Sequence, residues 1–266
     1  MNGFIKFLGT AGARIVVTKQ LRASGGIWLS NNNTSLLIDP GPGSLVRALS
    51  SRPKLDPSSL DAILLSHRHL DHSNDMNIMV EAMTEGTFKK RGEIFLPHDC
   101  LAEEPVLYRY LQNSVEKINF LAPGKSYILN DLEFNTPVSH IHSVETYGFR
   151  FKLPGNLIIS VVTDTLFTEE LIAAYKPTSL LIINTVRLKK ESSSPIQHLS
   201  IPDAERLIQE IKPQMAILTH FGLTVLKAKP WLIAQDLTQK LGIPVVAARD
   251  GWKLELNQFP LSEGKG

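Results

Sequence analysis

Apolar runs alternate with polar turns along the whole chain, and their lengths are typical of a protein that mixes strands and helices. Short apolar runs that end at turn residues predict strands at 4–8, 15–18, 27–30, 35–38, 62–65, 93–96, 118–121, 126–129, 131–138, 147–153, 157–162, 179–184, 215–219, 244–247 and 252–256. Apolar positions with helical spacing predict helices at 44–50, 75–84, 104–116, 168–174, 203–211 and 229–241. Hairpins and single α/β units occur in both halves of the chain, which favours an α/β fold with mixed sheets.

The chain of 266 residues and 29.5 kDa is long enough to bury one large core, and no Pro-, Ser- or Gly-rich linker divides it. We therefore expect a single domain over residues 1–266. The segment 99–121, which contains Tyr108, Arg109 and Tyr110, is interpreted either as a helical lid over the site or as a packing helix.

Composition narrows the classes of function. Hydrophobic residues make up 43% of the chain, and a net charge of +2 gives no bulk reason to expect nucleic-acid binding. No apolar run approaches the roughly 18–20 residues that a membrane span requires, and the N-terminus lacks the apolar core of a signal peptide. The single cysteine, Cys100, forbids an intrachain disulfide and fits a reducing compartment. We expect a cytoplasmic protein without membrane contact.

The most informative segment is Ser66-His67-Arg68-His69-Leu70-Asp71-His72, which directly follows the apolar run 62–65. That run predicts a buried strand, so the imidazoles and the carboxylate lie at its carboxyl end, where α/β folds place their chemistry. In extended or turn geometry His67 and His69 point the same way, while Asp71 and His72 turn toward a second point nearby. The spacing suits two adjacent metal ions, and a polar turn or a single adventitious metal site is the simpler alternative.

Further ligands for such a centre are present downstream, as they must be if each ion needs roughly four to six donors, some of them water. Asp164 and His220 each follow a strand-like apolar run, just as His67 does. Several strands would thus deliver ligands to one edge of the sheets. Taken alone, His140 is more typical of a satisfied polar side chain, and Asp164 of a turn or helix cap. The downstream candidates are His140, His142, Asp164, His198 and His220.

With these residues the chain resembles the metallo-β-lactamase superfamily, whose signature is His-x-His-x-Asp-His followed by a later His, a bridging Asp and a last His. The resemblance runs from Phe4 to about Leu256 and implies an αββα sandwich of two mixed sheets flanked by helices. It also implies that Asp39 orients a ligand without binding metal itself. The ligand sets that it implies are His67, His69 and His142 for one ion, Asp71, His72 and His220 for the other, and Asp164 as the bridge.

Two neighbouring cations lower the pKa of a shared water and neutralise charge on a substrate oxygen, which predicts hydrolysis. Phosphodiesters are favoured, with a metal-bound hydroxide attacking phosphorus, Asp71 aligning it, and His198 protonating the leaving group. His198 follows a polar, Ser-rich stretch at 192–195. The Gly-rich segment 7–14 places Arg14, with Arg22 close in sequence, where both could bind phosphate oxygens, although a plain turn is the simpler interpretation of that segment.

Two branches of the superfamily share these traits. The segment 142–148 and the first loop are similar to the tRNA 3′-processing endonucleases (ribonuclease Z), and 198–204 through 218–221 resembles the cyclic phosphodiesterases of phosphonate metabolism. The chain lacks the basic, Gly-rich arm with which the tRNA enzymes grip tRNA, and one cysteine cannot build the extra metal site of the phosphonate enzymes. We therefore expect a dinuclear phosphodiesterase for a small-molecule or nucleotide substrate, with zinc as the first choice of metal and manganese or iron as alternatives.

Other functions stay open at this point. They are hydrolysis of a carboxylic ester, lactone or thioester, tRNA 3′ processing, redox use of iron, and a metal- or RNA-binding module with a degenerate site. RNA is a partner that the net charge does not indicate, and a homodimer is one option for the oligomeric state.

Overall fold

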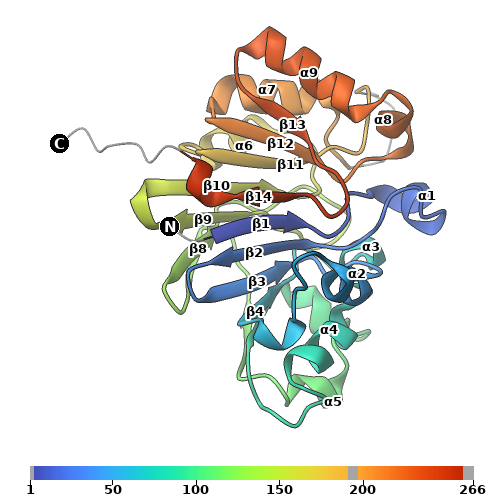
Figure 1. Ribbon diagram of the computed structural model, residues 1–266, viewed down its shortest axis with the longest axis vertical. Helices are drawn as coiled ribbons and strands as arrows, with labels where there is room; N and C mark the ends of the chain where they lie inside the picture. Colours follow the sequence, from blue (N-terminus) through green and yellow to red (C-terminus); the bar gives the residue numbers. More distant parts are fainter. Residues whose placement is uncertain (1–2, 191–196, 260–266) are drawn as a thin grey trace.

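The computed structural model describes residues 3–190 and 197–259, which form two seven-stranded sheets packed face to face with helices on both outer faces (Figure 1). The predicted αββα sandwich is confirmed. Among the described residues, no helix is both long enough and apolar enough to cross a membrane. The expectation of a single domain over 1–266 stays a prediction.

The first sheet has the strand order β14-β1-β2-β3-β4-β5-β6. Its β14 to β3 part is antiparallel, and β3 to β6 run parallel. The strands are β1 (Gly3–Phe7), β2 (Ile27–Asn31), β3 (Thr34–Ile38), β4 (Ala62–Leu64), β5 (Glu93–Leu96), β6 (Lys117–Phe120) and β14 (Lys253–Glu255).

The second sheet has the order β13-β12-β11-β10-β9-β8-β7. Strands β10 to β13 are parallel, whereas β7 to β10 form an antiparallel meander. The strands are β7 (Lys125–Leu129), β8 (Leu132–Thr136), β9 (Phe149–Leu153), β10 (Leu157–Val162), β11 (Leu180–Asn184), β12 (Met215–Thr219) and β13 (Val245–Ala247).

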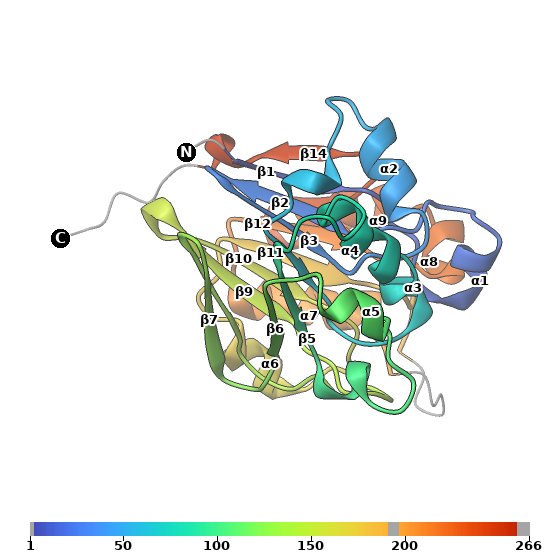
Figure 2. The same ribbon diagram turned by 90° about the horizontal axis from the view of Figure 1, so that it is seen from below.

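Helices cover the outer faces of both sheets (Figure 2). The helices on the side of the first sheet are α1 (Ala13–Thr18), α2 (Ser44–Ser50), α3 (Leu70–Ser73), α4 (Met76–Met83) and α5 (Arg109–Gln112). The helices on the side of the second sheet are α6 (Glu169–Ala174), α7 (Ile201–Ile211), α8 (Leu223–Lys227) and α9 (Pro230–Leu241).

Alternation along the strands explains the layers. Leu36 and Ile38 of β3 point into the core between the sheets, whereas Leu37 points outward into the core beneath α2 and α4. Because helices cover the outer face, both sets of positions are apolar, and these strands read as continuous apolar runs. Burial on both faces therefore made the strands recognisable in the sequence.

Two predicted elements are wrong. The predicted strand at 15–18 is the helix α1, in which Val16 is buried and Ile15 is half exposed. The chain leaves the sheet at the bridge between Ala11 and Phe221, so no neighbouring strand is left to pair with this segment and its backbone bonds internally. Its β-branched residues gave a misleading strand signal.

The predicted helix at 104–116 is also wrong, because only α5 within it is helical. Asn77 of α4 accepts a hydrogen bond from the backbone N–H of Tyr108 and donates one to the carbonyl of Val106, which holds the chain out of a helix there. Leu107, Leu111 and Val115 are nevertheless buried against the first sheet, as their spacing suggested. The lid interpretation of 99–121 stays a prediction.

Candidate metal centre

Strand ends of both sheets bring the predicted site residues to one edge of the sandwich, the edge where α1, α3 and α8 lie (Figure 1). Asp39 directly follows β3, and His67 lies three residues after β4. Asp164 and His220 follow β10 and β12 of the second sheet. The carboxyl ends of parallel strands meet at a common edge, so residues far apart in sequence converge there.

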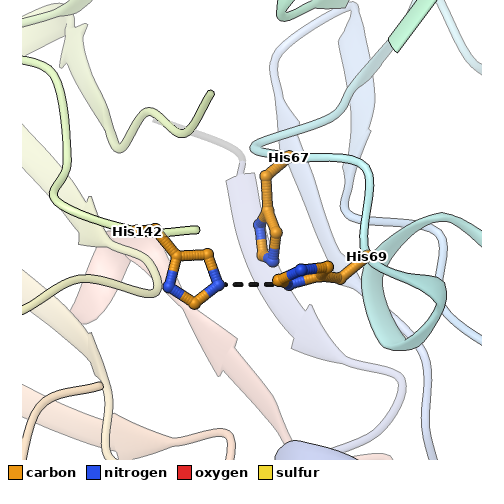
Figure 3. Close-up of side chains that lie close together, drawn as sticks. All are labelled: His67, His69 and His142. Atoms are coloured by element: carbon orange, nitrogen blue, oxygen red, sulfur yellow. Dashed lines mark hydrogen bonds between the residues drawn. The ribbon is translucent and has the colours of Figure 1, made fainter. Parts of the chain in front are cut away.

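A cluster of three histidines forms half of the centre (Figure 3). His67 and His69 come from the loop after β4, and His142 comes from the connection between β8 and β9. His142 Nε2 lies 3.1 Å from His69 Nδ1, and His67 Nε2 is buried without a hydrogen-bond partner. One nitrogen from each ring lies within 4.8 Å of the others, which is compact enough for a single ion.

A second cluster lies beside the first and consists of Asp71, His72, Asp164 and His220. Asp164 Oδ2 lies 3.3 Å from His72 Nε2 and 3.5 Å from His220 Nε2, and it is also 3.9 Å from His67 Nε2 in the first cluster. Asp71 Oδ2 lies 3.5 Å from His220 Nε2. The carboxylate of Asp164 therefore stands between the two clusters.

Hydrogen bonds fix which ring nitrogens face the centre. Asp39 Oδ2 lies 2.8 Å from His72 Nδ1 and also accepts from the Ser66 hydroxyl, whose oxygen lies 2.9 Å from His67 Nδ1. Both histidines thus carry their proton on Nδ1, which leaves the Nε2 lone pair free. The Nε2 atoms of His67, His72 and His220 are buried without hydrogen-bond partners. Such orphaned nitrogens beside carboxylates are the donor set that a divalent transition metal satisfies, so the residues present fit a metal centre.

The charges within the clusters also favour binding of a metal cation. Burial lowers the pKa of His67 well below its ordinary value. Burial also opposes charge on Asp164, but the nearby histidines, His220 first, outweigh it and hold the pKa of that carboxyl well below its usual range. At His220 burial is likewise outweighed, by Asp164 and Asp71, and the pKa rises to about 9. The carboxylates are therefore ionised and attract positive charge into a buried space.

His198 also reaches the centre. It lies just before α7, and its Nε2 is 3.1 Å from Asp164 Oδ2. Its ring packs edge-on against that of His142, with the ring centroids 5.1 Å apart. His142, Asp164 and His198 form a third group with ligand-like spacing. The Ser-rich stretch 192–195 that precedes it lies outside the described residues.

The remaining candidates lie farther from the clusters. Arg14 is exposed on α1, and Arg22 is half-buried with its guanidinium 3.3 Å from the hydroxyl of Thr10. The Gly-rich segment 7–14, which carries Arg14, lies against His220, because a Cβ atom at Gly12 would come within 2.1 Å of the His220 carbonyl oxygen. The roles of Arg14 and Arg22 in binding substrate stay a prediction.

His140 is no ligand in this arrangement, because both of its ring nitrogens already have partners, Tyr175 Oη at 2.7 Å and Thr163 Oγ1 at 3.1 Å. Burial lowers its pKa to about 4, so the ring is neutral. The sequence interpretation missed Ser66 and Asn184, which donate hydrogen bonds to Asp39 and Asp164. Asn184 could have been found, since it ends an apolar strand as the ligands do.

Known proteins match both the sequence and the fold. A family model described as a beta-lactamase superfamily domain matches residues 34–221. An uncharacterized protein of Methanocaldococcus jannaschii is 35% identical over 262 residues, which cover 95% of this chain and 94% of that protein.

Three solved structures share the fold. The metallo-beta-lactamase fold protein YhfI from Bacillus subtilis superposes with a TM-score of 0.79 at 21% identity, over 96% of this chain and 100% of that one. A diphosphatase from the PhnP family has a TM-score of 0.70 at 19% identity, with coverages of 96% and 98%. The short form of human tRNase Z has a TM-score of 0.69 at 16% identity, with coverages of 94% and 98%.

Proposed function

The chain belongs to the beta-lactamase superfamily and is a metal-dependent hydrolase of that fold, and we propose that its substrates are phosphodiesters. The observation that carries this proposal is the position of His198, whose Nε2 lies 3.1 Å from the central carboxylate of Asp164 at the rim of both clusters. A proton donor there assists departure of a poor leaving group such as an alkoxide.

The ligand assignment divides the clusters between two divalent ions. His67, His69 and His142 would hold one ion, Asp71, His72 and His220 would hold the other, and Asp164 lies within reach of both clusters. When bound, the ions supply Lewis acidity and make a water molecule more acidic. Imidazole-rich donor sets suit zinc first, and His/carboxylate sets also accept manganese or iron.

Other residues of the chain orient the reacting groups. Asp39 holds the His72 ring through a 2.8 Å hydrogen bond to Nδ1 and directs the free nitrogen inward. Asp71, whose pKa stays below its usual range because His72 and His220 outweigh its burial, remains an acceptor that can align a water molecule. His198 donates the proton to the leaving oxygen.

Local charge supports an anionic substrate. Residues 1–38 contain no Asp or Glu, although they supply Arg14 and Arg22 beside the Gly-rich segment that touches His220. We assign these two guanidinium groups to the non-reacting phosphate oxygens, for which Arg has suitable donor geometry. The neighbouring folds named as a diphosphatase and a tRNase also support phosphorus–oxygen cleavage. The buried, free thiol of Cys100 fits action in the cytoplasm.

Hydrolysis of carboxylic esters, lactones or thioesters competes with this proposal, and tRNA 3′ processing competes with a small-molecule or nucleotide substrate. A turnover panel on metal-analysed protein separates them, with bis-p-nitrophenyl phosphate, 2′,3′-cyclic nucleotides, a pre-tRNA, a lactone and a thioester. We expect turnover of the first two substrates. Activity confined to the lactone and thioester would contradict the proposal.

The variant His198→Ala tests the proton donor. A general acid contributes about 10²- to 10⁴-fold, so kcat on a 2′,3′-cyclic nucleotide should fall by that factor. With bis-p-nitrophenyl phosphate, whose leaving group needs no proton, the loss should stay below about tenfold. The control is His98→Ala, since His98 is exposed and its ring lies against that of Phe120, with the ring centroids 4.6 Å apart. Equal losses of kcat on both substrates, or loss of bound metal, would indicate that His198 is a metal ligand and not a general acid.

A further inference from the structure

We propose that Tyr175, His140 and Thr163 are positioning residues that form one buried hydrogen-bonded chain and hold the loops of the two metal clusters in register. This inference rests on the proposed metal centre. None of the three side chains belongs to the two metal clusters, and all three are buried, with exposed fractions of 0%, 6% and 1%.

The chain runs through four groups. Tyr175 Oη lies 2.7 Å from His140 Nε2, and His140 Nδ1 lies 3.1 Å from Thr163 Oγ1. Thr163 Oγ1 in turn lies 2.8 Å from the carbonyl oxygen of Tyr147. The groups thus link the end of α6 to the end of β10 and to the loop before β9.

Only one arrangement of protons satisfies this chain. The Tyr147 carbonyl can only accept, so the Thr163 hydroxyl donates to it. The Thr163 oxygen then accepts from His140 Nδ1–H, and His140 Nε2 accepts from the Tyr175 hydroxyl. Each bond fixes the next, which gives the loops a single preferred arrangement.

Three of the four groups lie close to a metal ligand in sequence or bond to the residue beside one, and Tyr175 acts through His140. Thr163 precedes Asp164, the residue between the clusters, and His140 lies two residues before His142. The N–H of Tyr147 donates to the carbonyl of Ser66, directly before His67. The chain therefore reaches ligands of the three-histidine cluster and the central carboxylate together.

The local packing shows that this contact is specific. A Cβ atom at Gly148 would lie 2.1 Å from Tyr175 Oη and 2.8 Å from His140 Cε1, so the backbone approaches the two rings too closely for any side chain. An apolar core would not need such an approach, and burying three polar groups is costly unless every one is satisfied. The hydrogen bonds therefore fix the orientation of the two rings and of the loops bonded to them, in addition to filling the core.

The test is Tyr175→Phe, which removes one hydroxyl and leaves the ring volume unchanged. The control is Tyr127→Phe, because Tyr127 Oη is hydrogen-bonded to the backbone of Phe120 and Ala122 in the core between the sheets and serves no ligand loop. Zinc affinity is measured by competition with a chromophoric chelator, and ligand geometry by the visible absorption spectrum of the cobalt-substituted protein.

We expect Tyr175→Phe to lose zinc affinity, by at most the about 10- to 100-fold seen for residues bonded directly to a ligand, and to shift the cobalt spectrum, while Tyr127→Phe changes neither. Thr163→Ser, which keeps the hydroxyl, should retain the wild-type values, and Thr163→Val should lose them. If Tyr175→Phe does not fold, the comparison of Thr163→Ser with Thr163→Val tests the inference by itself.

Wild-type zinc binding and spectra in Tyr175→Phe and Thr163→Val would overturn this inference and leave the proposed function intact. Equal effects in Tyr175→Phe and Tyr127→Phe would also overturn it, since they would indicate general core loosening. A wild-type protein that binds no zinc, manganese or iron would overturn the proposed function and this inference together.

Discussion

The variant Asp39→Asn tests whether one outer carboxylate decides which nitrogen of His72 faces the metal centre. Asp39 Oδ1 accepts the backbone N–H of Ser66 at 2.7 Å, and Oδ2 accepts the Ser66 hydroxyl and His72 Nδ1–H, each at 2.8 Å. Asn has nearly the same shape and tolerates the left-handed backbone at this position, where φ is 54°. The substitution therefore changes chemistry more than shape.

The amide nitrogen of Asn at this position cannot accept a hydrogen bond, so two hydrogen bonds to a charged group are lost, each worth about 1.5–3 kcal/mol. Ser66 and His72 can respond by becoming acceptors, the imidazole by moving its proton from Nδ1 to Nε2. We therefore expect a net loss of only about 2 kcal/mol in the free energy of unfolding. The proton then occupies Nε2, the atom that lies 3.3 Å from Asp164 and is needed for metal.

Zinc affinity of the second cluster should fall about 10- to 100-fold in Asp39→Asn, which corresponds to about 1.4–2.8 kcal/mol. Chelator competition measures the affinity, and urea unfolding in the presence of EDTA measures the stability without metal. The control is Asp61→Asn, because Asp61 accepts a 2.8 Å bond from the N–H of Ser35 in the same sheet and contacts no ligand. If Asp39→Asn binds two zinc ions as tightly as the wild type, the reasoning about His72 is wrong.

Two further predictions concern the unsubstituted protein. Removing metal with EDTA should lower the unfolding free energy in urea by about 2.7 kcal/mol for each ion that had been present at 100 times its dissociation constant, and an unchanged urea midpoint would contradict the assignment of a metal centre. Burial raises the pKa of the Cys100 thiol, so the thiol stays protonated, and we expect Ellman's reagent at pH 8 to react with it only in unfolded protein. Rapid reaction of the native protein would show that the segment around Cys100 opens easily.

The sequence pointed to most of the residues that the structure brings together in the two clusters, because these residues obey a local rule. His67, Asp164 and His220 each follow an apolar strand, and that pattern survives folding because strands buried on both faces must be apolar throughout. The order and type of most strands followed from the same pattern. Residue type alone was enough to predict a strand wherever the strand is buried on both faces and must therefore be apolar.

Other features could not be predicted because they depend on partners distant in sequence. The spacing of His140 and His142 is equally suited to metal binding, yet Tyr175, 35 residues beyond His140, occupies one ring nitrogen of His140 and so removes it from the ligand set. The segment 15–18 has strand-forming residues but no strand beside it to pair with. Both outcomes depend on which groups meet in space.

By itself, the sequence determined the family, the layered α/β architecture and the set of side chains able to bind metal. Only the tertiary structure decided which nitrogens those side chains present. The partners of His72 and His142 come from other loops, and Ser66, which bonds to His67, is itself oriented by Asp39. The resemblance had already implied Asp164 as the bridge, and the structure supplies the distances, because the ends of both sheets meet at one edge there. Residue type is a local property, whereas a coordination site is a relation between distant parts of the chain.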